Sequence, residues 1–201
     1  MKKVLFLTNN DISLNLYDWL KERCREEIFR NRLTIQIINS IRPDLIISYN
    51  YRYIIPKDVI ECMKGNIINL HISLLPWNRG ASPNFWSFVE ETPKGVTIHQ
   101  INSGLDEGKL IYQKECLLDP EKETFETSYN KLNYEITELF KQNWDEIREG
   151  SFPLCEQIGE GSYHTMGDLN KLREKCPFQW SDNIADFIER YHFLCKAEKS
   201  L

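Results

Sequence analysis

The stretch LIISYNYRYIIPKDVIECMKGNIINLH, residues 45–71, indicates the fold because it contains a strand, a helix and a second strand in succession. Residues 45–48 (LIIS) form a nearly continuous apolar run, which is typical of a strand buried on both faces of a sheet. Pro56 suits the start of a helix and Gly65 its end, and residues 66–71 (NIINLH) are again largely apolar. Two strands joined by a helix form a parallel βαβ unit, so the stretch predicts an α/β fold.

The sequence before this stretch continues the alternation. Residues 3–8 (KVLFLT) predict a strand, and Asp11 is placed to cap a helix with apolar residues on one face. A second helix is expected over about 31–41, ending before Pro43. No apolar run suggests another strand before residue 45, so we expect two helices there and a sheet with fewer strands.

The sequence after this stretch predicts further strands and then helices. Residues 84–91 suggest a helix, and 95–101 and 109–118 suggest two strands that pair as an antiparallel extension of the sheet. Apolar residues then keep a helical period from Thr124 to Glu149. Ser181 is placed to cap a last helix. We expect a catalytic domain over 1–150 and a short helical extension, 151–201, packed on the same domain.

Composition and charge exclude several classes of function. The 25 basic and 30 acidic residues give a net charge of -5, and no dense run of Lys and Arg suits a nucleic acid partner. No apolar stretch approaches a membrane span, and the apolar run in MKKVLFLTNND is too short for a secretory leader. The expectation is a cytoplasmic protein without a membrane partner. The six cysteines are far apart and lack the spacing of a zinc site, so reduced, mostly buried thiols are expected rather than disulfides.

Common nucleotide and hydrolase motifs are absent. The sequence contains no G-x-G-x-x-G turn after the first strand, no P-loop and no G-x-S-x-G elbow. Polar residues collect instead after the predicted strands, at 8–11, 48–52 and 71–79. Ligands of open α/β sheets bind at these carboxyl ends of the strands.

Asn69 and His71 are candidate catalytic residues within the predicted strand 66–71. Alternate residues of a strand share a face, so both side chains would project toward one ligand. The amide can donate to a developing oxyanion, the imidazole can relay a proton, and Asp106 or Glu107 can orient that imidazole. Such a set suits attack of an amine on a polarised carbonyl. In isolation, however, such a pair is more often an ordinary hydrogen-bonded strand end.

The wider pattern resembles the 10-formyltetrahydrofolate-dependent formyltransferases. NLHISLLPWNRG (69–80) and GVTIHQINSGLDEGKLI (95–111) contain the family's Asn-x-His strand end, S-L-L-P turn and D-x-G loop in order. The resemblance is clear over about 43–118 and implies a compact Rossmann-like formyltransferase fold, a mostly parallel sheet flanked by helices. It also implies that Asn69, His71 and Asp106 are catalytic, with 10-formyltetrahydrofolate as co-substrate and no metal.

The resemblance further implies contacts to the folate and to the acceptor. The pterin would be held through backbone groups of two loops, with contacts at Tyr51, Arg52, Tyr53, Ile55, Ile101, Asn102 and Gly104, although residues 51–53 could equally be a solvated turn. His99 would support the site or simply pack. The acceptor contacts implied by a likeness to bacterial sugar formyltransferases are Ser73, Trp77, Arg79, Ser82 and Asn84. Arg79 can pair with a diphosphate and Trp77 or Trp86 can stack on a base, but tryptophans in such turns more often only pack.

The acceptor implied by the resemblance is a nucleotide-linked aminodeoxy sugar, with a UDP-linked 4-amino sugar for surface glycans as the narrower guess. Methionyl-tRNA enzymes carry a basic C-terminal domain that this sequence does not suggest, and glycinamide ribonucleotide enzymes usually have a glycine-rich turn that TNNDISLNL (8–16) lacks. A carrier-bound aminoacyl acceptor and a non-catalytic folate or sugar-nucleotide binding module are the remaining alternatives. A homodimer is a further option.

Overall fold

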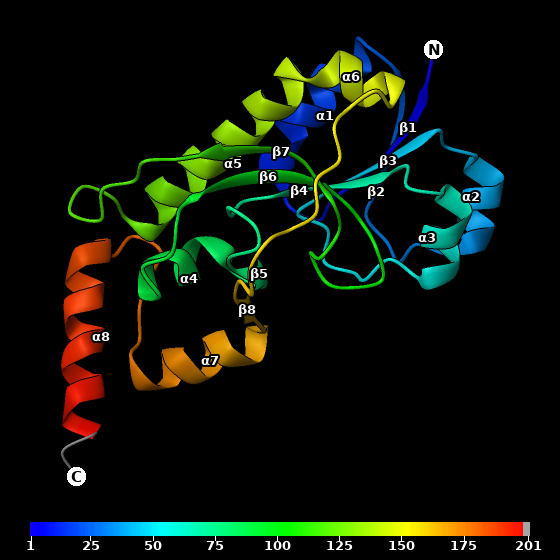
Figure 1. Cartoon of the computed structure of the whole chain (residues 1–201). Coiled ribbons are helices and arrows are strands. Elements are labelled where there is room, and N and C mark those ends of the chain that lie inside the picture. Colours follow the sequence, from blue (N-terminus) through cyan, green and yellow to red (C-terminus); the bar gives the residue numbers. More distant parts are fainter. Residues whose placement is uncertain (199–201) are drawn as a thin grey trace. The chain divides into compact units, whose positions relative to one another are not determined.

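The computed structural model describes residues 1–198 of the 201-residue chain (Figure 1). The strands are β1 (Lys3–Leu7), β2 (Arg25–Phe29), β3 (Leu45–Tyr49), β4 (Ile67–His71), β5 (Arg79–Gly80), β6 (Gly95–Gln100), β7 (Leu110–Glu115) and β8 (Tyr163–His164). A 3-10 turn, η1 (Asp11–Ser13), precedes the first helix. The α-helices are α1 (Leu14–Lys21), α2 (Ile35–Ile41), α3 (Lys57–Met63), α4 (Pro83–Val89), α5 (Phe125–Gln142), α6 (Trp144–Glu149), α7 (Met166–Lys175) and α8 (Ile184–Glu198).

Six strands form one sheet in the order β2-β1-β3-β4-β6-β7. β1 is parallel to β2 and β3, and β3 is parallel to β4, whereas β6 runs antiparallel to β4. Hydrogen bonds from Gln100 N to Lys109 O and from Cys116 N to Lys94 O pair β6 with β7 in the antiparallel sense. All five residues of β3 are buried, as the apolar run predicted. The expected α/β fold with an antiparallel extension is therefore confirmed.

Strand β2 contradicts the expectation that no strand lies between the first strand and residue 45. Its sequence is REEIF, and none of its five residues is fully buried. It pairs in parallel register with β1 and forms one edge of the sheet. An edge strand pairs on one side only and does not need the continuous apolar run by which buried strands are recognised. The prediction of a sheet with fewer strands was wrong for this reason.

Two helix caps also differ from the predicted ones. Asn10, not Asp11, caps η1, because its side chain accepts a hydrogen bond from the backbone N–H two residues on at 3.2 Å. Asn183, not Ser181, caps α8, and its Oδ1 accepts from the N–H three residues on at 3.1 Å. Asn is among the best cap residues because its short side chain reaches the unpaired N–H groups of the first turn.

The helical stretch predicted from Thr124 to Glu149 is broken at Asn143, between α5 and α6. The Asn143 side-chain amide donates to Leu139 O at 2.8 Å, and its backbone N–H donates to Phe140 O at 3.2 Å. A polar side chain that bonds the preceding turn competes with the regular helical pattern. Apolar periodicity alone did not reveal this break.

The chain divides into two compact units. Unit 1 comprises residues 1–71, 97–113 and 136–158, and unit 2 comprises residues 72–96, 114–135 and those from 159 on. The core of unit 1 is formed by Leu5, Leu7, Leu33, Ile38, Ile46, Ile55, Val59, Met63 and Ile67. The core of unit 2 is formed by Phe85, Trp86, Phe88, Phe125, Leu169, Leu172, Cys176, Phe178, Ile184 and Phe187. The boundary expected near residue 150 stays a prediction.

Two expectations from composition can be compared with the structure. The six cysteines are free thiols, but only Cys24 and Cys176 are buried, so the prediction of mostly buried thiols was wrong. Each of the other four keeps part of its surface exposed. Within residues 1–198, none of the helices combines the length and the apolar character that crossing a membrane would need.

Candidate active site

Strands β4 and β6 bring the first three polar side chains of the site together within unit 1. Asn69 lies opposite His99, and His71 lies opposite Thr97, in the antiparallel register. The rings of His71 and His99 are 6.2 Å apart at an interplanar angle of 84°. His71 is 7% exposed and His99 is 1% exposed. The end of β4 and the facing part of β6 therefore present an amide and two imidazoles in an almost closed environment.

Asp106 completes this cluster from the loop between β6 and β7. Its Oδ1 accepts a hydrogen bond from Asn69 Nδ2 at 3.2 Å and lies 3.5 Å from His99 Nε2. Its Oδ2 lies 3.8 Å from His71 Nδ1, a separation that suits charge pairing rather than a direct hydrogen bond. The structure thus gathers Asn69, His71 and Asp106, as expected. The neighbouring carboxylate, Glu107, is exposed.

The backbone of this loop is held in an uncommon conformation. Asp106 has a φ of 54°, in the left-handed region that Asp and Asn tolerate better than most residues. Gln157 Nε2 donates to Asp106 O at 2.7 Å and to Gly108 O at 2.9 Å. A Cβ atom at Gly108 would lie 1.7 Å from Gln100 O, so only glycine fits there. Gln157 was missed from sequence because it lies 51 residues after Asp106 in a stretch without periodicity.

The first predicted folate loop follows β3, and most of its side chains have partners inside unit 1. Tyr51 Oη donates to Asn31 O at 2.5 Å and accepts from Leu33 N at 3.0 Å. Its ring packs edge-on against Tyr53 with centroids 5.4 Å apart. The Tyr51 side chain therefore fastens the loop, and what remains for a ligand is mainly the backbone and exposed neighbours such as Arg52.

The second predicted folate loop lies beside the same apolar core. Ile55 belongs to the core of unit 1, and Tyr51 and Ile101 pack against it. The backbone N–H of Ile101 donates to Ile67 O at 2.9 Å, and that of Gly104 donates to Asn102 Oδ1 at 3.0 Å. One hydrophobic cluster thus supports both loops that the resemblance assigned to the pterin.

The predicted acceptor residues lie in unit 2 and fall into two groups. Ser73 and Asn84 are buried, and each has partners inside the protein. Ser73 Oγ donates to Trp77 O at 2.7 Å, and Asn84 Nδ2 donates to Phe125 O at 3.1 Å and Ser128 Oγ at 3.0 Å. We therefore leave both out of the acceptor site proposed below. The second group keeps part of its surface exposed and consists of Trp77, Arg79 and Ser82.

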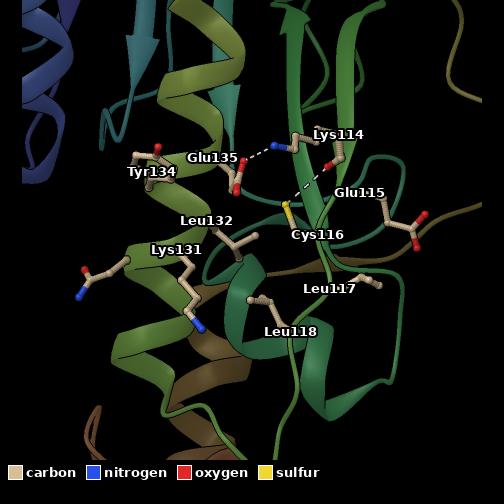
Figure 2. A pocket seen from close by; sticks show the side chains of 10 residues that line it. Lys114, Glu115, Cys116, Leu117, Leu118, Lys131, Leu132, Tyr134 and Glu135 are labelled. Carbon is tan, nitrogen blue, oxygen red and sulfur yellow. Dashed lines mark hydrogen bonds and ion pairs between the residues drawn. The ribbon is translucent and has the colours of Figure 1, made fainter.

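A pocket of about 670 Å³ lies elsewhere in unit 2, between the end of β7 and the middle of α5 (Figure 2). Lys114 and Glu135 form an ion pair of 2.5 Å at its wall. Burial raises the pKa of the Cys116 thiol to about 11, so this thiol is protonated near neutral pH. None of the predicted site residues lines the pocket. Most of the surface that lines the pocket is apolar.

The cluster around Asp106 can therefore donate hydrogen bonds, move a proton and balance charge. Its members carry no hydroxyl or thiol, so the cluster offers no serine- or cysteine-type nucleophile for an acyl-enzyme intermediate. Within the described chain, no group of three or more His, Cys, Asp or Glu side chains is arranged to hold a metal ion.

Comparison with known proteins identifies the family. Residues 11–142 match the family model described as formyl transferase. The chain belongs to this family. The structure of the formyltransferase PseJ from Anoxybacillus kamchatkensis, in complex with UDP-4,6-dideoxy-4-formamido-L-AltNAc and tetrahydrofolate, is similar with a TM-score of 0.82. The two sequences are 40% identical, and the matched region covers 92% of this chain and 97% of the PseJ chain.

Curated relatives in the family act on different acceptors. Methionyl-tRNA formyltransferase of Thermodesulfovibrio yellowstonii is 36% identical over 70% of this chain and 46% of its own length. dTDP-4-amino-4,6-dideoxyglucose formyltransferase of Mycobacterium tuberculosis is 32% identical over 66% of this chain and 55% of its own length. The chain thus spans about half the length of the curated relatives it matches.

Proposed function

We propose that this protein transfers the formyl group of 10-formyltetrahydrofolate to the amine of a nucleotide-linked amino sugar. The proposal is supported above all by the likeness to PseJ across nearly the whole of both chains, because the PseJ structure holds a UDP-linked formamido sugar and tetrahydrofolate. A UDP-linked 4-amino sugar is accordingly the first acceptor to test, as a precursor of surface glycans. We further propose a cytoplasmic location and no nucleic acid or membrane partner.

In this reaction the acceptor amine attacks the formyl carbon, and its new bond to carbon replaces the bond between that carbon and N10 of the folate. Asn69 donates a hydrogen bond to the carbonyl oxygen as that oxygen gains negative charge. His71 takes a proton from the attacking amine and delivers it to the departing N10. Asp106, 3.8 Å from His71, balances the charge of the protonated imidazole.

The folate and the acceptor would be held by different parts of the chain. Backbone groups of residues 51–55 and 101–106 would bind the pterin, a role that fits loops whose side chains are partly committed to internal packing. Trp77, Arg79 and Ser82 would contact the acceptor, with the Arg79 guanidinium suited to a diphosphate.

Methionyl-tRNA is a second candidate acceptor, supported by the relative from Thermodesulfovibrio yellowstonii. The sequence leaves three further alternatives to formylation of a sugar nucleotide. The acceptor could be glycinamide ribonucleotide or a carrier-bound aminoacyl group, or the protein could bind its ligands without turnover. The net charge of -5 favours the sugar nucleotide, since binding a tRNA backbone relies on clustered positive charge.

The decisive experiment measures tetrahydrofolate release from 10-formyltetrahydrofolate with a panel of acceptors. The panel contains UDP- and dTDP-linked amino sugars, glycinamide ribonucleotide and methionyl-tRNA. We expect release with a sugar nucleotide and formation of its formamido product, detected by mass spectrometry. Release with methionyl-tRNA alone would contradict the proposed acceptor, and no release with any acceptor, while folate still binds, would favour a carrier-bound amine or a binding module.

His71→Ala supplies the matched control for this assay. We expect turnover to fall by about 10²-fold or more, because proton transfer by a positioned side chain contributes roughly that much, while folate binding is retained. Turnover near the wild-type rate would show that His71 is not the proton carrier. Sedimentation of the same preparations would test the predicted homodimer.

A further inference from the structure

His99 makes a specific set of hydrogen bonds that the proposed reaction does not yet use. It lies on β6 directly opposite Asn69 on β4 and is almost completely buried. Its Nδ1 is 2.8 Å from the backbone carbonyl oxygen of Gln100. Its Nε2 is 3.2 Å from Asn69 Nδ2 and 3.5 Å from Asp106 Oδ1. Both ring nitrogens therefore face polar partners.

The Gln100 carbonyl determines which nitrogen of His99 carries hydrogen. A carbonyl oxygen can only accept, so Nδ1 must be the protonated nitrogen. In the neutral ring, Nε2 then holds a lone pair and can only accept, and the donor beside it is the Asn69 amide. The geometry thus points to an Nδ1–H tautomer that receives a hydrogen bond from Asn69.

The orientation of the Asn69 amide follows from its two neighbours. The Asp106 carboxylate oxygen accepts hydrogen bonds, so the amide must turn its nitrogen, not its oxygen, toward Asp106. An amide nitrogen carries two hydrogens, and here Asp106 Oδ1 and His99 Nε2 each lie 3.2 Å from that nitrogen. The amide thus has two acceptors inside the protein, one for each hydrogen.

An amide in this state can stabilise a reacting carbonyl only by redirecting one of its two hydrogens. Giving up the bond to Asp106 would separate the amide from the charge that orients it. The bond to His99 is the one that can be exchanged, because Nε2 is a neutral acceptor whereas Asp106 Oδ1 belongs to a carboxylate, and hydrogen bonds to charged groups are the stronger ones.

We propose that His99 is a positioning residue, which holds the Asn69 amide nitrogen in place and frees one of its hydrogens for the formyl oxygen. This inference rests on the proposed role of Asn69 in formyl transfer. His99 acts through Asn69 and itself touches neither the folate nor the acceptor.

The first test is independent of any acceptor. Nitrogen-15 NMR of the imidazole side chains in the full-length protein, near neutral pH, reports the tautomer of each neutral histidine. The His99→Gln variant assigns the signal by its loss. We expect hydrogen on Nδ1 and a lone pair on Nε2 of His99, and hydrogen on Nε2 would overturn the proposal.

The second test separates positioning from packing by kinetics. His99→Phe keeps a ring but cannot accept from Asn69, whereas His99→Gln offers an amide oxygen that can. We expect kcat to fall about tenfold or more in His99→Phe, less than the loss of a whole oxyanion donor, with KM for 10-formyltetrahydrofolate within about twofold. His99→Gln should recover most of kcat. Melting temperatures of both variants serve as the folding control.

Equal kcat in wild type and His99→Phe, or an equal loss in both variants with unchanged melting temperatures, would overturn the proposal. These outcomes differ from failure of the proposed function. If the wild type formylates none of the acceptors, the function proposal fails, whereas the tautomer of His99 is still decided by NMR.

Discussion

Asp106 combines a charge with an uncommon backbone conformation, and single substitutions can separate the two. Its φ of 54° is a conformation that Asn also tolerates, so Asp106→Asn should preserve the loop while removing the negative charge. Because His71 then lacks the partner that balances its proton, we expect kcat to fall by about 10²-fold. Kinetics of tetrahydrofolate release, with whichever acceptor the panel of compounds selects, would measure the effect.

Thermal unfolding provides the control for this prediction. We expect the melting temperature of Asp106→Asn to stay near that of the wild type, since Asn can still accept from Asn69. A variant with wild-type kcat would show that Asp106 shapes the loop and does not contribute its charge to the reaction.

The sequence could predict Asn69, His71 and Asp106 because each belongs to a short motif whose order along the chain is recognisable. It could not predict Gln157, which reaches Asp106 O and Gly108 O from a distant segment. Nor could it show that Ser73 and Asn84 turn inward, since a polar residue beside tryptophans looks the same whether it is buried or exposed. Such outcomes depend on tertiary packing.

At the scale of elements, the start of α5 in unit 2 depends on a buried carboxylate, Glu123. Burial raises its pKa, but hydrogen bonds from Lys131 and from Thr127, the latter at 2.6 Å, outweigh burial and leave the pKa lowered. A lowered pKa in the folded state means that the unfolded chain binds the proton more tightly. The stabilisation is therefore present above the ordinary glutamate value of 4.5 and is lost as pH falls through the folded value.

Urea unfolding at about pH 7 and about pH 4 tests this prediction. Glu123→Gln should be less stable than the wild type at the higher pH and should lose less stability on acidification. Glu126→Gln, on the exposed face of the same helix, is the matched control and should follow the wild type. An identical pH dependence in wild type and Glu123→Gln would contradict the prediction.

Most elements could be predicted because their apolar residues follow a strand or helix period. The structure differs where tertiary or local polar contacts prevail. Strand β2 is stabilised by pairing with β1, not by its own composition, and the break at Asn143 arises from a side-chain amide that bonds Leu139 O. Neither contact produces an apolar pattern.

At the scale of the whole molecule, each compact unit is assembled from three separate segments. The core of unit 2 joins Phe85 and Phe125 to Phe178 and Phe187, with ring centroids 4.5 to 5.5 Å apart. A chain cut at residue 150 would lose the last two rings and the helices α7 and α8. The extension is therefore part of a core, not an addition to a finished one.

We expect the fragment 1–150 to lack a cooperative unfolding transition, because the apolar side chains left exposed cannot bury their surface elsewhere. Circular dichroism during urea unfolding, with binding of a hydrophobic dye, would measure this, and the intact chain is the control. A fragment that unfolds as cooperatively as the intact chain would show that residues 1–150 form an independent domain.

The charged residues of β2 also affect whether the protein aggregates in concentrated solution. Strand β2 forms one edge of the sheet, where an outer row of main-chain groups can template cross-β growth onto another chain. Arg25, Glu26 and Glu27 would have to lose water when a second copy docked there, and identical charges would meet in a parallel, in-register stack. The charges of β2 therefore disfavour amyloid-like assembly at this edge of the sheet.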